Sequence, residues 1–134
     1  MFDPEAFKNA AIHDVISDKY VPMPVGDYYG LCSKVECKAG ESARGPWAYL
    51  EMTFDFDQRK NKRLSFWLRF DDEGHLDKNR NLILGQLRKA IGKDTGAFNW
   101  TDAEGHSMMV GIGHEADKED AEKLYERITG FRKG

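Results

Sequence analysis

Three large aromatic residues share the polar side of two neighbouring segments whose patterns are typical of strands. Apolar and polar residues alternate over 47–56 and 63–70, and Trp47, Tyr49 and Trp67 lie on the parity opposite to the apolar one. Arg63 and Arg69 share that parity. Aromatic rings can stack on nucleic-acid bases, and arginines can contact phosphates. The pattern therefore predicts a surface that binds a single-stranded nucleic acid. The alternative is that these aromatic residues pack under an N-terminal arm or in a dimer interface.

Basic residues gather in the turn between these two segments. Arg59, Lys60 and Lys62 stand directly before Arg63. If the segments form a hairpin, these residues would make a basic finger beside the aromatic surface, able to close on a strand. A charge run at a hairpin tip can also simply be solvated, and that alternative stays open.

Carboxylates offer an alternative chemistry. Glu51, Asp55 and Asp57 share one strand parity, and residues 71–73 are all acidic, so a magnesium-dependent nuclease is conceivable. No histidine or lysine stands at a motif spacing with these carboxylates, and the sequence has no phosphate-loop, nucleophile-elbow or zinc pattern. We therefore expect no catalytic residue, no metal and no cofactor.

The net charge of −3 hides a strong asymmetry. Residues 59–93 contain ten basic and four acidic side chains, a balance of +6, while the remainder carries −9. Phosphate binding depends on where Lys and Arg gather rather than on the total. A basic middle between acidic ends can form one basic face.

The two cysteines, Cys32 and Cys37, are five residues apart. On one regular strand this spacing puts their side chains on opposite faces and about 16 Å apart. That is too far for a disulfide, so we expect free thiols in a reducing compartment.

The length of 134 residues, with 16 aromatic residues, suits a single domain with a hydrophobic core. No apolar run approaches the roughly 18 residues of a membrane helix, and the first residues lack the pattern of a secretory signal. We expect a cytoplasmic protein that does not act at a membrane.

Periodicity predicts an N-terminal arm over 1–22, five strands and one helix. The arm begins with a short helical turn, with Asp3 as its cap and Pro4 in its first turn. The expected strands cover 25–38, 47–56, 63–70, 108–112 and 124–131, and the expected helix covers 79–91 before Gly92.

The periodicity also predicts which apolar residues of these elements face the core. The first strand should place Tyr29, Leu31, Val35 and Cys37 on one side. The helix should present Leu82, Ile83, Leu87, Ala90 and Ile91 on one stripe, and the last strand has Tyr125, Ile128 and Phe131 as its apolar points.

The expected element order is three strands, one helix and two further strands. This is the order of the five-stranded OB-type barrel. The fold class expected is therefore mainly β, with one domain over 1–134 and the barrel over 25–131. An α+β sandwich with the same element order is the alternative. In OB barrels the face of the second and third strands binds oligonucleotides, and the aromatic residues lie on those two strands.

Three stretches resemble small phage-encoded single-stranded DNA-binding proteins: PVGDY over 24–28, NLILGQLRKAIG over 81–92 and ERITGF over 126–131. The resemblance covers about residues 22–131. It implies an OB fold without enzymatic activity that coats single strands during phage DNA replication, recombination and repair in the host cytoplasm. By strand position, it implies that Trp47, Tyr49 and Trp67 stack on bases. Many such proteins end in an acidic tail that recruits partner enzymes, whereas this sequence ends in Phe131-Arg132-Lys133-Gly134. If the chain is complete, this difference puts recruitment by a tail in doubt.

The leading hypothesis is thus a non-sequence-specific single-stranded DNA-binding protein without a cofactor. Its expected binding residues are Trp47, Tyr49, Arg59, Lys60, Lys62, Arg63, Trp67 and Arg69. The alternative is a protein-interaction module that uses the same aromatic surface to form a homodimer or to dock a replication or recombination protein.

Overall fold

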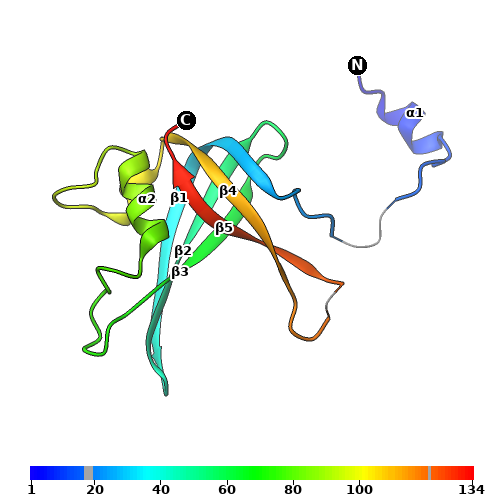
Figure 1. The fold of residues 1–134 in the computed structure, drawn as a ribbon. Helices are drawn as coiled ribbons and strands as arrows, with labels where there is room; N and C mark the ends of the chain where they lie inside the picture. The colour runs from blue at the N-terminus through cyan, green and yellow to red at the C-terminus, as the bar shows by residue number, and fades with distance from the viewer. Residues whose placement is uncertain (17–19, 121) are drawn as a thin grey trace.

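Five antiparallel strands form one sheet in the order β3-β2-β1-β4-β5 (Figure 1). The computed structural model describes residues 1–16, 20–120 and 122–134. The strands are β1 (Gly26–Ser42), β2 (Gly45–Phe56), β3 (Lys62–Leu68), β4 (Ser107–Ala116) and β5 (Leu124–Arg132), and the helices are α1 (Pro4–Asn9), α2 (Leu82–Ala90) and the 3-10 helix η1 (Trp100–Ala103). The prediction of a mainly β protein is confirmed.

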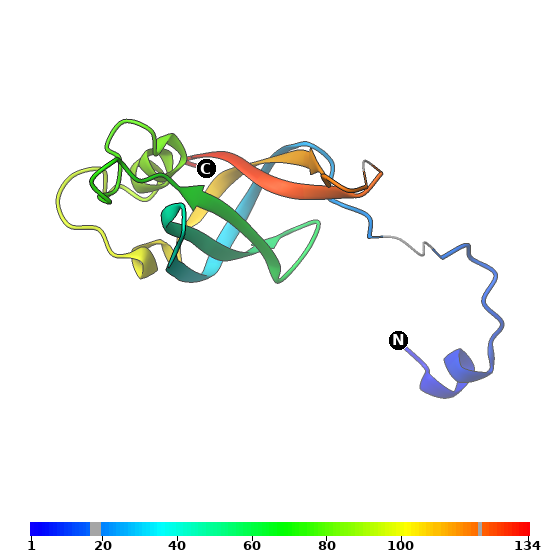
Figure 2. The same ribbon diagram turned by 90° about the horizontal axis from the view of Figure 1, so that it is seen from below.

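The two edges of the sheet, β3 and β5, approach each other on one side of the core. Phe66 and Phe131 meet with ring centroids 5.8 Å apart, and Lys62 lies 2.7 Å from Glu126. Among the described residues, no ladder of backbone hydrogen bonds joins these two strands. The sheet is therefore strongly curved, as Figure 2 shows, but it is not closed into a barrel.

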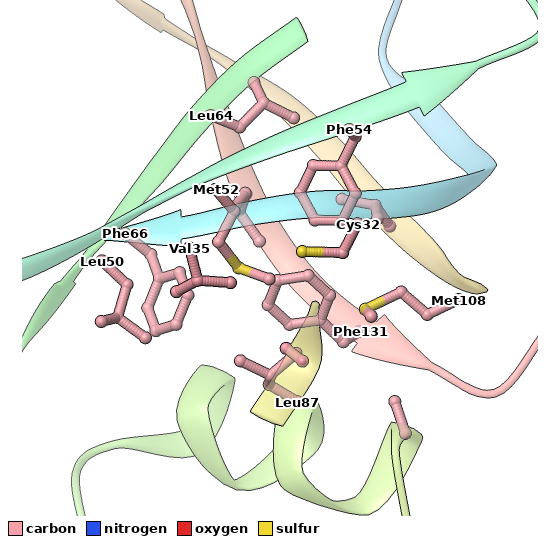
Figure 3. Close-up of a cluster of buried hydrophobic side chains, with 14 of the residues drawn as sticks. Cys32, Val35, Leu50, Met52, Phe54, Leu64, Phe66, Leu87, Met108 and Phe131 are labelled. Atoms are coloured by element: carbon pink, nitrogen blue, oxygen red, sulfur yellow. The ribbon is translucent and has the colours of Figure 1, made fainter. Parts of the chain in front are cut away.

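The core lies between the curved sheet and α2. Strict alternation in β2 and β3 buries the expected side chains, and Figure 3 shows them pointing into one interior together with residues of β1, β4, β5 and α2. The fully buried members include Leu50, Met52, Phe54, Phe56, Leu87 and Met108. The expected strand faces of β2 and β3 are confirmed, so the side chains of opposite parity point outward.

The prediction for β1 is wrong in its first half because the strand contains a bulge. Pairing with β2 shifts between Cys32 and Lys34, which adds one residue and reverses the parity. Tyr29 and Leu31 are consequently exposed, whereas Val35 is buried.

The same bulge puts both cysteines on the core side, not on opposite faces. Cys32 is fully buried and Cys37 packs partly against the core, and both are free thiols. Burial raises the pKa of Cys32 to about 11, so this thiol stays protonated and unreactive near neutral pH.

Helix α2 begins later than expected, at Leu82. The Asp77 carboxylate accepts hydrogen bonds from the backbone N–H groups of Asn79 and Arg80, which holds this stretch in a turn. Leu82 was expected on the apolar stripe but is exposed, because the face that α2 turns to the core carries Leu84, Leu87, Ala90 and Ile91 instead. The helix ends as predicted, with Gly92 at a φ of 75°.

A second bulge adjusts the pairing of β4 with β5. The register shifts between Gly111 and Ile112, which leaves Thr129 as the extra residue and allows both Ile128 and Phe131 to be buried. Tyr125 was expected on the apolar side, but it is exposed and donates a hydrogen bond to Asp117.

The N-terminal arm starts with α1, whose cap is the one predicted. The Asp3 carboxylate accepts hydrogen bonds from the N–H groups of Glu5 and Ala6, and Pro4 is the first helical residue. No residue of α1 is buried, and the helix lies apart from the sheet (Figures 1 and 2). Within the described ranges, no helix is long and apolar enough to cross a membrane.

Candidate nucleic-acid interface

Trp47, Tyr49 and Trp67 form a three-ring aromatic cluster on the outer face of β2 and β3. Tyr49 and Trp67 are direct cross-strand partners with ring centroids 5.0 Å apart. Trp47 lies nearly parallel to Tyr49, at 6.2 Å and 16°, and meets Trp67 edge-on at 6.3 Å. Trp67 is 60% exposed and Trp47 is 37% exposed. The aromatic cluster is thus preassembled by ring–ring contacts and keeps ring surface open to solvent.

A glycine of β1 supports this arrangement. Gly40 is the cross-strand partner of Trp47. A Cβ atom at Gly40 would lie 2.6 Å from the indole, so only the absence of a side chain lets the ring lie close against the β1 backbone. In sequence, Gly40 belongs to a stretch rich in turn formers, and its role beneath Trp47 emerges only from the pairing register.

Charged side chains of both signs border the aromatic cluster. Arg63 points outward with its side chain 72% exposed, and its guanidinium lies 4.0 Å from Glu51. Glu51 also lies 3.9 Å from Lys38, the cross-strand partner of Tyr49. Lys38 therefore joins Arg63 beside the rings, although the sequence did not mark it as a binding residue. Exposed pairs at these distances are weak, so both cations can exchange Glu51 for an anionic ligand.

The residues of the expected basic finger have different roles in the structure. Arg59 donates hydrogen bonds to the Tyr20 hydroxyl and the Val21 carbonyl, and Lys62 binds Glu126. These two residues hold the segment that precedes β1. Lys60, in contrast, is exposed and has no hydrogen bond or ion pair within the described part of the chain.

Glu126 is the centre of the contacts that occupy Lys62. Its side chain, 3% exposed, accepts hydrogen bonds from Lys62, the Tyr20 hydroxyl and the backbone N–H of Met23. Burial alone would raise the pKa of Glu126, but these hydrogen bonds outweigh burial and hold the pKa below its ordinary value. Lys62 therefore fastens the N-terminal segment to the sheet and is not available to a ligand.

Arg69 lies just beyond the end of β3, on the outward parity that the sequence predicted. Its backbone is fixed by Asn81, whose side chain accepts from the N–H of Arg69 at 2.8 Å and donates to its carbonyl at 3.0 Å. The Arg69 side chain itself is exposed. The interface thus brings together Trp47, Tyr49, Arg63, Trp67 and Arg69, and it leaves Arg59 and Lys62 in another role.

The carboxylates that suggested a nuclease do not converge. Glu51 contacts Lys38 and Arg63, while Asp55 accepts a hydrogen bond from the N–H of Asn61. Among the described residues, no group of three His, Cys, Asp or Glu side chains has a geometry that could hold a metal ion.

Comparison with known proteins adds no relative to this picture. No protein-family model matches the chain, and no curated protein matches it in sequence.

Proposed function

We propose that the protein binds single-stranded DNA without sequence specificity, through base stacking on the aromatic cluster. The observation that carries the proposal is the solvent exposure of Trp47 and Trp67 on a sheet surface next to Arg63. Large exposed apolar surfaces mark binding sites, and the basic neighbours favour a ligand that combines flat rings with negative charge. A single strand offers both, because its unpaired bases expose their faces between phosphates.

We further propose that the fold is an OB-type barrel that remains partly open between β3 and β5. The element order, with α2 between β3 and β4, supports this assignment, as does the approach of β3 to β5 through Phe66 and Phe131. The β2–β3 face is the oligonucleotide-binding face of OB folds. The aromatic cluster occupies that face.

In this mechanism the rings supply sequence tolerance and the cations supply affinity. Each base stacked on an aromatic ring contributes roughly 1–3 kcal/mol whatever its identity. Arg63 and Lys38 would contact phosphates and release counterions, which makes binding weaker as salt increases. No step requires a cofactor or a bond-breaking residue.

Titration with an oligothymidylate of about 16 nucleotides tests the proposal. Binding should quench tryptophan fluorescence, because two of the three tryptophans belong to the aromatic cluster. Affinity should fall steeply between low and moderate salt. Absent binding, or binding that ignores salt, would refute the proposed function.

The resemblance in sequence supports a cellular role for this binding. On that basis the protein would coat single strands during phage DNA replication, recombination and repair, and replication or recombination proteins would be its protein partners.

A protein-interaction module is the second candidate function. It is favoured by a run of exposed apolar side chains in the N-terminal arm, where Phe2, Phe7, Ile12 and Ile16 are each at least 65% exposed. Such residues commonly bind a protein partner or a second copy of the chain. Sedimentation distinguishes the candidates, since a stable dimer that does not respond to oligonucleotide favours the second one.

A further inference from the structure

A groove of about 460 Å³ extends the interface beyond the aromatic cluster. Trp67 and Arg69 line it on the β3 side, Arg127 lines it on the β5 side, and Arg80 and Leu82 line it at the start of α2. Trp67 belongs to both the aromatic cluster and the groove. A ligand stacked on Trp67 therefore has a direct path between the two edges of the sheet.

The groove is basic. Three arginines line it, namely Arg69, Arg80 and Arg127. Among the described lining residues, Glu115 is the only acidic one. Arg80 is already engaged, because its Nε lies 2.9 Å from Asp77 and its Nη2 donates to the Phe70 carbonyl at 2.8 Å. The other two arginines are exposed, and their side chains have no hydrogen-bonding or ionic partner in the described part of the chain.

Arg69 and Arg127, the two arginines without a partner, belong to backbone segments that are held by neighbouring elements. The two hydrogen bonds to Asn81 hold Arg69 at the end of β3. Arg127 is paired with Gly113 across β4 and β5, and its side chain lies against that glycine, where a Cβ atom would be 3.5 Å from Arg127 Nε. The two guanidinium groups are thus carried by paired or hydrogen-bonded backbone on the β3 and β5 sides of the groove, and neither has a carboxylate partner among the described residues.

We infer that this groove binds the sugar–phosphate backbone of the strand whose bases stack on the aromatic cluster, with Arg69 and Arg127 contacting phosphates. The inference depends on the proposed function, because it assigns the path that the same strand takes after Trp67. Guanidinium groups suit phosphates, to which they donate two parallel hydrogen bonds. The apolar side chain of Leu82, 71% exposed, provides a surface against which a sugar or base can rest.

The test measures how binding of an oligothymidylate of about 16 nucleotides depends on salt. In single strands, each phosphate contact contributes about 0.7 to the slope of log affinity against log salt. The double variant Arg69→Gln/Arg127→Gln should therefore lose about 1.4 from that slope. The matched control Lys89→Gln/Lys133→Gln removes the same charge from a different surface, between α2 and the end of β5. It should retain the wild-type slope.

Three results separate the possibilities. A reduced slope in the glutamine variant, restored by Arg69→Lys/Arg127→Lys, supports the inference, and thermal unfolding shows that all variants are folded. An unchanged slope while the wild-type protein binds the strand overturns the inference alone, and leaves the groove to a different ligand such as an acidic protein segment. No binding by the wild-type protein overturns both the inference and the proposed function.

Discussion

Lys62 Nζ lies 2.7 Å from Glu126 Oε1, and this ion pair joins β3 to β5, the two edges of the sheet. Both side chains are largely buried, with 14% of Lys62 and 3% of Glu126 exposed. The pair takes the place of backbone hydrogen bonds where the two edges approach. It also anchors the chain just before β1, because Glu126 accepts from the backbone N–H of Met23.

Replacing Glu126 with glutamine should destabilise the fold. Glu126→Gln keeps the shape of the side chain but leaves the Lys62 ammonium without a buried counterion, a change that costs about 3–5 kcal/mol in comparable pairs. Urea unfolding followed by circular dichroism measures the loss. Glu119→Gln, at an exposed position, is the matched control and should stay within about 0.5 kcal/mol of wild type. Equal stability of the two variants would contradict a structural role for the pair.

The contribution of Glu126 should depend on pH in one direction. Because its pKa in the folded protein is below the ordinary 4.5, the folded state favours the charged carboxylate. The resulting stabilisation is fully present above the ordinary pKa and is lost as pH falls through the folded-state value. The stability difference between wild type and Glu126→Gln should therefore be largest at about pH 7 and should shrink towards about pH 3. A difference that grows on acidification would show that the sign is wrong.

Removing one exposed ring should weaken binding without unfolding the protein. Trp67→Ala deletes a side chain that is 60% exposed, and the loss of one stacked base corresponds to about 1–3 kcal/mol, or roughly 5- to 150-fold in affinity. Tyr125→Ala is the control, because Tyr125 is an exposed aromatic residue outside the aromatic cluster. Fluorescence anisotropy of a labelled oligonucleotide reports affinity, and a thermal melt reports stability. Unfolding of Trp67→Ala would contradict the outward orientation of this residue.

The faces of β2 and β3 were predictable from sequence because a strict alternation in each reports directly which side is buried. The aromatic cluster followed from the same parity. The first half of β1 could not be predicted, since a single extra residue near Ser33 reverses the parity and leaves no mark in the alternation of apolar residues. Tyr29 and Leu31 were misplaced for that reason.

The roles of Arg59 and Lys62 were hidden by distance along the chain. Tyr20 is 39 residues from Arg59, and Glu126 is 64 residues from Lys62. A local charge run reports that side chains are basic but carries no information on partners that only the fold brings together. The same limit concealed the groove, since Arg127 meets Arg69 and Trp67 only through the approach of β5 to β3.

Replacing Gly40, which lies beneath Trp47, with alanine should displace the indole. Gly40→Ala places a methyl group 2.6 Å from the indole, so the ring must move away from β1 and from its stacked position on Tyr49. We expect tryptophan emission to shift and affinity for a single strand to fall by about fivefold, equivalent to about 1 kcal/mol of lost stacking.

Gly85→Ala provides the comparison for this variant. Gly85 lies in α2 with open space around it, so alanine there should raise the free energy of unfolding by about 0.5–1 kcal/mol and leave binding unchanged. If both alanine variants bind the oligonucleotide like wild type, Trp47 does not need its present position, and stacking must depend on Trp67 and Tyr49 alone. A loss confined to Gly40→Ala would instead establish that the β1 backbone, through the absence of one side chain, sets the geometry of the aromatic cluster.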